Sequence, residues 1–172
     1  MPEVTSMVTS EVATLATPET FARLISQVTR KIAGRAVDAA LADFLASEFP
    51  ASGKIFQEIF AACQVGVKAG WLCAREAGGI KYGRAIKPSP EMDGFSVDVV
   101  EMENVKGPHH RHPKGEVDMI MPLSGEPTFD GHGRGWLVYG PDSAHPPTVS
   151  GGRALVLYLL PDGAIEFTDF AK

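Results

Sequence analysis

The densest group of potential metal-binding side chains lies in residues 109–116, which read HHRHPKGE. Residues two apart on a strand point to the same face, so His110 and His112 project together. A bend at residues 113–115 then returns the carboxylate of Glu116 to the same centre. Two imidazoles and a carboxylate at this spacing predict that the segment binds a metal ion.

A fourth donor follows about thirty residues later, at His145 in the segment GPDSAH. Nitrogen and oxygen donors of this kind accept Fe, Mn, Zn, Ni or Cu, so the pattern predicts one divalent transition metal without fixing its identity. Three protein ligands alone would leave positions open for substrate or water. The competing interpretation is a polar loop whose histidines are solvated.

The residues around these donors divide by strand parity. If Glu116 points inward, Asp118 shares its face and is a candidate to orient a ligand or act as a general acid or base, a role also open to Glu116. A cross-strand ion pair is the alternative for Asp118. His109 has the opposite parity and is expected to point outward or lie beside the metal, and His132 falls in an exposed turn or at the mouth of the site.

The N-terminal part of the chain has helical periodicity. Thr17 suits the N-cap and Pro18 the first position of a helix. Residues 1–16 have no clear period and are interpreted as a loose arm or a short docking segment. Apolar residues at helical spacing predict three helices, over residues 17–34, 36–48 and 52–78.

After the glycines at positions 78 and 79, short segments separated by Gly, Pro and Asp are typical of antiparallel strands. We therefore expect a helical region over residues 1–78 and a sandwich or small barrel over residues 79–172. The expected strands are 80–86, 95–103, 108–112, 116–121, 127–129, 135–139, 153–160 and 164–168.

The formal net charge of −5 argues against a nucleic-acid partner. Neither region is basic, since seven Lys and Arg face eight Asp and Glu in residues 1–78, and nine face thirteen in residues 79–172. Cys63 and Cys73 both fall in the third predicted helix, too far apart for a bond, and indicate buried thiols in a reducing compartment. The absence of a basic leader or a long apolar run predicts a cytoplasmic protein without a membrane span.

The two donor segments resemble the two motifs of the cupin superfamily, His-x-His followed by Glu and then a Gly/Pro turn followed by His. The resemblance implies a small jelly-roll-like β-barrel that holds one metal through His110, His112, Glu116 and His145. The departures from the usual motifs affect turns and barrel wall, and they leave the four ligands unchanged: Gly125 lies two residues late, GPD replaces Pro-x-Gly, and Val149 stands where Asn is common.

A closer resemblance covers most of the chain. The segments HHRHPKGEVDMIMPLSG and FDGHGRGWLVYGPDSAHPPTVSGGRALVLYLLPDGAIEF, with the helical region before them, are similar to the bacterial 4-hydroxylaminobenzoate lyases. The resemblance implies conversion of 4-hydroxylaminobenzoate and water to 3,4-dihydroxybenzoate and ammonia during nitroaromatic breakdown. The substrate is then a small aromatic carboxylate.

Such a substrate requires a cation for its carboxylate and a surface for its ring. Tyr82 and Arg84 share one strand face, and an arginine binds a carboxylate through two hydrogen bonds, so Arg84 is the first candidate. Lys81, Arg134 and Arg153 are the alternatives, and each of these cations alone also suits a plain surface position. The candidates for the ring platform, which also suit the core, are Trp136, Tyr139 and Tyr158.

Two other functions fit the same residues. One is a different cupin enzyme, a non-haem iron dioxygenase or an isomerase acting on a small aromatic or keto acid. The other is a non-enzymatic ligand-binding cupin, although the acidic helical region lacks the basic character of a DNA-binding helix pair. The apolar stripes of the helices must be buried on the outer wall of the barrel or against another subunit, and we expect a homodimer.

Overall fold

The computed structural model describes residues 16–168. Its three α-helices are α2 Pro18–Ile32, α3 Ala39–Glu48 and α4 Lys54–Ala69. The side chain of Thr17 caps α2 by accepting a hydrogen bond from the Thr20 backbone N–H, and Asp38 caps α3 through the Leu41 N–H. The second helix therefore begins three residues later than expected, because its cap is Asp38. Of the predicted N-terminal arm, residues 1–15 lie outside the described residues.

The third helix ends earlier than the sequence predicts. Gly70 takes a left-handed conformation with φ of 90° after the last helical residue. The carbonyl oxygen of Gly66 then accepts hydrogen bonds from the N–H groups of Gly70, Trp71 and Leu72 at 3.0–3.1 Å. Cys73 therefore lies outside the helix, contrary to expectation, although both cysteines are buried and free as predicted.

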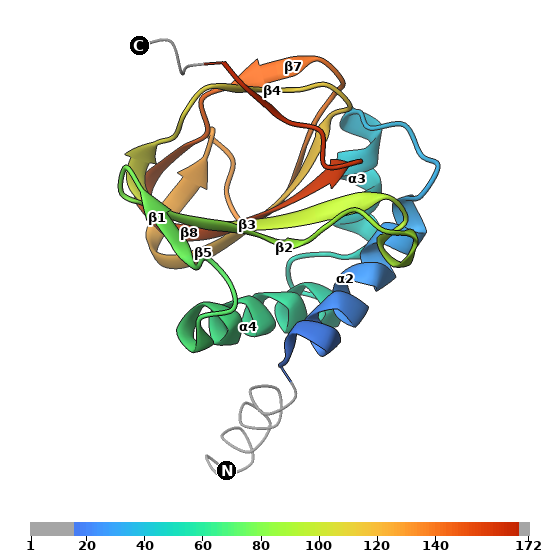
Figure 1. The fold of residues 1–172 in the computed structure, drawn as a ribbon, viewed down its shortest axis with the longest axis horizontal. Helices are drawn as coiled ribbons and strands as arrows, with labels where there is room; N and C mark the ends of the chain where they lie inside the picture. Colours follow the sequence, from blue (N-terminus) through green and yellow to red (C-terminus); the bar gives the residue numbers. More distant parts are fainter. Residues whose placement is uncertain (1–15, 169–172) are drawn as a thin grey trace.

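The described strands form two antiparallel sheets (Figure 1). One has the order β1-β2-β3-β8-β5-β6, and the other has the order β7-β4-β9. Their bounds are β1 Arg75–Ala77, β2 Ile80–Ile86, β3 Phe95–Lys106, β4 His110–His112, β5 Glu116–Phe129, β6 Gly135–Tyr139, β7 Ser143–His145, β8 Thr148–Pro161 and β9 Glu166–Phe167. A 3-10 turn at Pro90–Met92 precedes β3. The predicted fold class is confirmed as mainly β with N-terminal helices, and the sheets are jelly-roll-like without closing into one barrel.

Strand pairing explains where the expected strand limits differ. The predicted strands 116–121 and 127–129 are one strand, β5, because register shifts against β8 absorb the residues between them. β1 and β7 are missing from the expected strands, because each is three residues long and lacks an apolar alternation.

The helices pack on the outer face of the six-stranded sheet, with α2 and α4 lying along one side of it in Figure 1. Val117, Met119 and Met121 of β5 join the buried helical residues in this core. The alternate residues Asp118 and Ile120 face the interior between the sheets, where Ile120 belongs to a second core. The apolar stripes of the helices are thus buried within the chain, and the expected homodimer stays a prediction.

No helix among the residues described is long and apolar enough to cross a membrane. The division into residues 1–78 and 79–172 also stays a prediction, and β1 at Arg75–Ala77 already pairs with β2 across the glycine turn.

The close approach at the end of α4 generates a stability prediction. A Cβ atom at Gly66 would lie 2.6 Å from Leu72 Cδ1 and 2.9 Å from Trp71 Cζ3. We expect Gly66→Ala to lower the free energy of unfolding by about 1 kcal/mol or more, since overpacking outweighs the gain in helix propensity. Chemical denaturation measures this. Gln64→Ala, on the exposed face of the same helix, should change stability by less than about 0.5 kcal/mol, and equal stabilities of the two variants would refute the packing argument.

Candidate metal centre

Three strands from the two sheets bring the four predicted donors together. His110 and His112 lie on β4, His145 pairs with His110 from β7, and Glu116 begins β5. The bend before Glu116 requires a glycine, because Gly115 has φ of 91°. The interpretation of the segment as a solvated polar loop is wrong, since all four side chains are buried.

The donor atoms form one compact group. Glu116 Oε1 lies 3.2 Å from His112 Nε2 and 3.7 Å from His110 Nε2, and Glu116 Oε2 lies 3.5 Å from His145 Nε2. One ligand atom from each residue lies within 4.8 Å of every other. These distances suit side chains that surround a single ion.

The inward-facing atoms are buried and without hydrogen bonds. This holds for the Nε2 atoms of His110, His112 and His145 and for both carboxylate oxygens of Glu116. Burying polar atoms without a partner costs free energy, and a metal ion removes that cost by coordinating them. The donor set therefore fits a divalent transition metal, and Fe, Mn, Zn and Ni are all compatible with it.

The outward-facing nitrogens of the same rings are fixed by hydrogen bonds. His110 Nδ1 lies 3.2 Å from the Pro108 carbonyl oxygen. His112 Nδ1 lies 2.9 Å from Ser143 Oγ, which itself donates to the Gly140 carbonyl oxygen. Because these oxygens accept from Nδ1–H, the lone pair of each ring is on Nε2 and points to the centre.

His145 is fixed by a carboxylate that sequence reasoning missed. Its Nδ1 bonds to Asp130 Oδ2, which also accepts from the Tyr139 hydroxyl at 2.6 Å. Asp130 Oδ1 accepts from the Thr148 N–H at 2.9 Å. Burial raises the pKa of Asp130, but the bonds from His145 and Tyr139 outweigh it and lower the pKa below its ordinary value. Spacing along the sequence does not reveal that the turn at Asp130 faces His145.

The charges of the cluster are coupled. Burial raises the pKa of Glu116, but the three facing imidazoles outweigh it and hold the pKa well below the ordinary value. Burial lowers the pKa of His145, and the neighbouring carboxylates of Asp130 and Glu116 outweigh it and raise the pKa to about 9. The centre thus presents a carboxylate anion to whatever cation it holds.

Asp118 lies beside the cluster on the same face of β5 as Glu116. It is fully buried, and neither carboxylate oxygen has a hydrogen bond. Burial, and then the negative charge of Glu116, raise the pKa of Asp118 well above its ordinary value. In the sheet Asp118 stands opposite Tyr158 of β8, so the alternative of a cross-strand ion pair is wrong.

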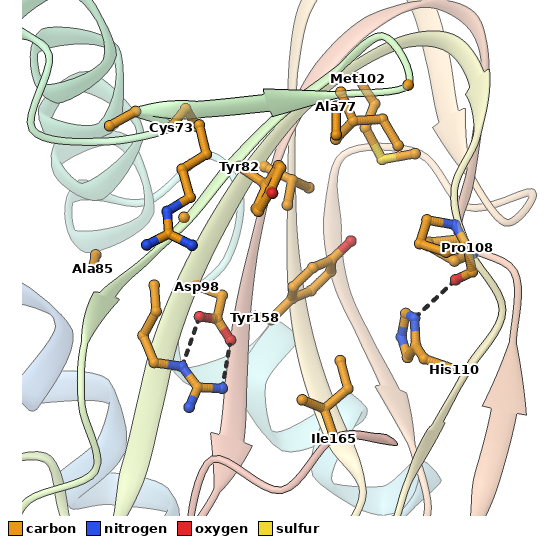
Figure 2. Close-up of a pocket in the computed structure, with 18 of the residues that line it drawn as sticks. Cys73, Ala77, Tyr82, Ala85, Asp98, Met102, Pro108, His110, Tyr158 and Ile165 are labelled. Atoms are coloured by element: carbon orange, nitrogen blue, oxygen red, sulfur yellow. Dashed lines mark hydrogen bonds and ion pairs between the residues drawn. The ribbon is translucent and has the colours of Figure 1, made fainter. Parts of the chain in front are cut away.

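A cavity of about 960 Å³ reaches the cluster at His110. The predicted residues Tyr82, Arg84 and Tyr158 line it. In Figure 2 the ring of Tyr158 projects into the space between Tyr82, Ile165 and His110. The cavity therefore connects the candidate metal centre with an aromatic wall.

Two of the predicted platform residues lie elsewhere. Trp136 pairs with Met119 on the helix-facing side of the sheet, and its Nε1 donates to the Phe49 carbonyl oxygen at 2.8 Å. Tyr139 packs against the His145 imidazole, with ring centroids 4.4 Å apart. Neither residue lines the cavity. Trp136 is not the cross-strand partner of Asp118, so its side chain takes the opposite face of the sheet, and the Tyr139 hydroxyl is turned to Asp130.

The remaining candidate cations and histidines lie outside the cavity wall. Lys81 and Arg153 both approach Glu101, by strand pairing and by a 3.8 Å ion pair respectively, and Arg134 lies over the Phe60 ring. His109, directly before β4, bonds to Thr168 rather than to the donor cluster, and His132 is exposed, as parity and turn position predict.

Comparisons with known proteins give the family of the chain. A model of the 4-hydroxylaminobenzoate lyase family matches residues 23–167. Two relatives named 4-hydroxylaminobenzoate lyase come from a Nocardioides species and Pseudomonas putida. The first is 31% identical over 74% of this chain and 80% of its own length, and the second is 27% identical over 80% and 88%.

Solved structures with detectable likeness include a DMSP lyase from Ruegeria pomeroyi, 19% identical over 91% of this chain and all of that chain, with a TM-score of 0.42. An RmlC-like cupin protein from Ralstonia eutropha is 15% identical over 56% of this chain and 64% of its own, with a TM-score of 0.41. Because the family match spans far more than half of the sequence, the chain belongs to the 4-hydroxylaminobenzoate lyase family.

Proposed function

We propose that the chain is a metal-dependent lyase that converts 4-hydroxylaminobenzoate and water to 3,4-dihydroxybenzoate and ammonia. Membership of the family supports the reaction class. The observation that carries the proposal is that His110 belongs both to the donor cluster and to the wall of the cavity. A small aromatic molecule in that cavity reaches the metal centre directly.

The metal would be held by the Nε2 atoms of three histidines and the carboxylate of Glu116. When bound, a divalent ion supplies Lewis-acid chemistry that polarises an oxygen of the substrate or of water. The overall reaction needs no external oxidant or reductant. Reductive loss of the N–O bond balances the conversion of one ring C–H bond to a C–O bond, and replacement of the ring C–N bond by a second C–O bond releases the nitrogen as ammonia.

The side chains of the chain supply binding and proton transfer. Tyr82 and Tyr158 offer aromatic surface to the substrate ring from two sides of the cavity. Asp118 stands opposite Tyr158 and shares one face of β5 with Glu116, and it is our first candidate to exchange a proton with a reacting group. Glu116 is the second candidate for this role. Burial excludes bulk water from both carboxyls.

An anaerobic assay on 4-hydroxylaminobenzoate tests the function. Protein loaded with its metal should release ammonia and 3,4-dihydroxybenzoate in equal amounts without dioxygen, and a chelator should stop the release. Stoichiometric oxygen uptake would instead indicate a dioxygenase. Binding without turnover under both conditions would favour a ligand-binding protein.

Cytoplasmic location and a homodimer remain predictions from the sequence. Size-exclusion chromatography with light scattering measures the second directly.

The donor cluster predicts a loss of metal on removal of one imidazole. His112→Ala should weaken metal affinity by at least about 100-fold and abolish product release, because the remaining donors no longer surround the ion. Metal analysis of the purified variant measures this. His132→Ala removes an exposed imidazole and should keep full metal content. Equal metal loading in both variants would contradict the assigned ligands.

The hydrogen bond between Asp130 and His145 predicts a partial loss of metal affinity when it is weakened. Asp130→Asn weakens the acceptor for His145 Nδ1–H and should reduce metal affinity about 10- to 100-fold. A competition titration with a chelating dye measures the change. Asp142→Asn is the matched control, since Asp142 pairs with Arg111 on the outer side of β4. A loss of affinity as large in the control would show that charge alone is responsible.

The position of Asp118 predicts a loss of rate without loss of metal. Asp118→Asn keeps the shape of the side chain and removes its exchangeable proton, so kcat should fall about 10²- to 10⁴-fold. Steady-state assays with parallel metal analysis measure this. Asp43→Asn on the exposed face of α3 should leave kcat unchanged, and an unchanged kcat in Asp118→Asn would remove Asp118 from the mechanism.

A further inference from the structure

The cavity wall carries an excess of positive charge. Four cationic side chains line it, on Arg75, Arg84, Lys87 and Lys106, against the single carboxylate of Asp98. A cavity with low-dielectric walls and one sign of charge concentrates ligands of the opposite sign. The cavity is therefore built for an anion.

Arg84 is already neutralised within the protein. Its Nε donates to Asp98 Oδ1 at 2.9 Å and its Nη2 to Asp98 Oδ2 at 3.2 Å, which is the two-point geometry that a substrate carboxylate would need. The same Nη2 lies 3.3 Å from the Gly163 carbonyl oxygen. This arginine thus ties β2 to β3 and to the turn that precedes Ile165 and Phe167 of the cavity wall.

Arg75 has the opposite character. It lies on β1, directly opposite Tyr82 in the sheet, and cross-strand partners share one face. Its side chain is exposed, and its guanidinium has no ion pair or hydrogen bond with any residue of the part that the structure describes. Among the cavity-lining residues it is the one guanidinium whose two-point fork is free.

We propose that Arg75 is the specificity-determining residue that binds the carboxylate of the aromatic substrate. The inference rests on the proposed function for the identity of that substrate. A para-substituted ring directs its two groups to opposite ends, so a carboxylate held at Arg75 leaves the nitrogen-bearing end free to approach His110, which lines the same cavity from the other sheet. Lys87 and Lys106 add to the positive potential without a two-point contact.

Binding of 4-aminobenzoate, compared with neutral 4-aminobenzamide, tests the proposal by calorimetry on the full metal-loaded chain. Arg75→Ala should bind 4-aminobenzoate about 10- to 100-fold more weakly and the amide within about 2-fold, as expected for loss of a hydrogen bond to a charged group. Arg75→Lys should recover part of the loss, since an ammonium makes a point contact.

Three matched variants each remove one positive charge: Lys87→Ala, Lys106→Ala, and Arg30→Ala, an exposed residue of α2 that does not line the cavity. Each should cost less than about 3-fold in 4-aminobenzoate affinity. The proposal is overturned if a lysine variant costs more than Arg75→Ala, if Arg75→Ala weakens acid and amide equally, or if the parent chain binds neither. Binding requires no turnover, so failure of the lyase assay with preserved discrimination would refute the reaction alone.

Discussion

Three imidazole nitrogens and one carboxylate face one another in the interior without a hydrogen bond, and the structure around them keeps them so. Left alone, such a group costs free energy and would rotate toward other partners. The Pro108 carbonyl, Ser143 and Asp130 prevent this by fixing the far nitrogen of each ring. Rigid outer contacts thus maintain an inner set of donors in readiness for a cation.

A single strand separates this polar centre from the largest apolar core. Along β5, Val117 and Met119 pack under the helices, while Glu116 and Asp118 face the interior. Successive side chains of β5 therefore face different surroundings, the apolar core on one side and the polar centre on the other. A one-residue slip of β5 would exchange the two faces. The long pairing with β8 opposes that slip, with Val117 opposite Leu159 and bulges only beyond Pro122.

Sequence alone located what depends on parity and spacing along one segment. His110, His112 and Glu116 follow from strand period and one bend, and His145 from its turn, and all four meet as expected. It missed what depends on contacts between separate segments. The bond between Asp130 and His145 joins a turn to β7, and Arg75 lies opposite Tyr82 because a short turn pairs β1 with β2. Trp136 does not lie in the cavity as predicted, because the sequence of its own segment does not determine which face of the sheet its side chain takes.

The bend before Glu116 brings the helical region into contact with the segment that carries the metal-binding candidates. A Cβ on Gly115 would lie 2.6 Å from Val37 Cγ1, in the loop before α3, and 2.8 Å from the Tyr139 carbonyl oxygen. The loop between two helices therefore packs directly against the turn that precedes Glu116. A β region transplanted without residues from that loop would carry the full ligand set and lose one side of its support.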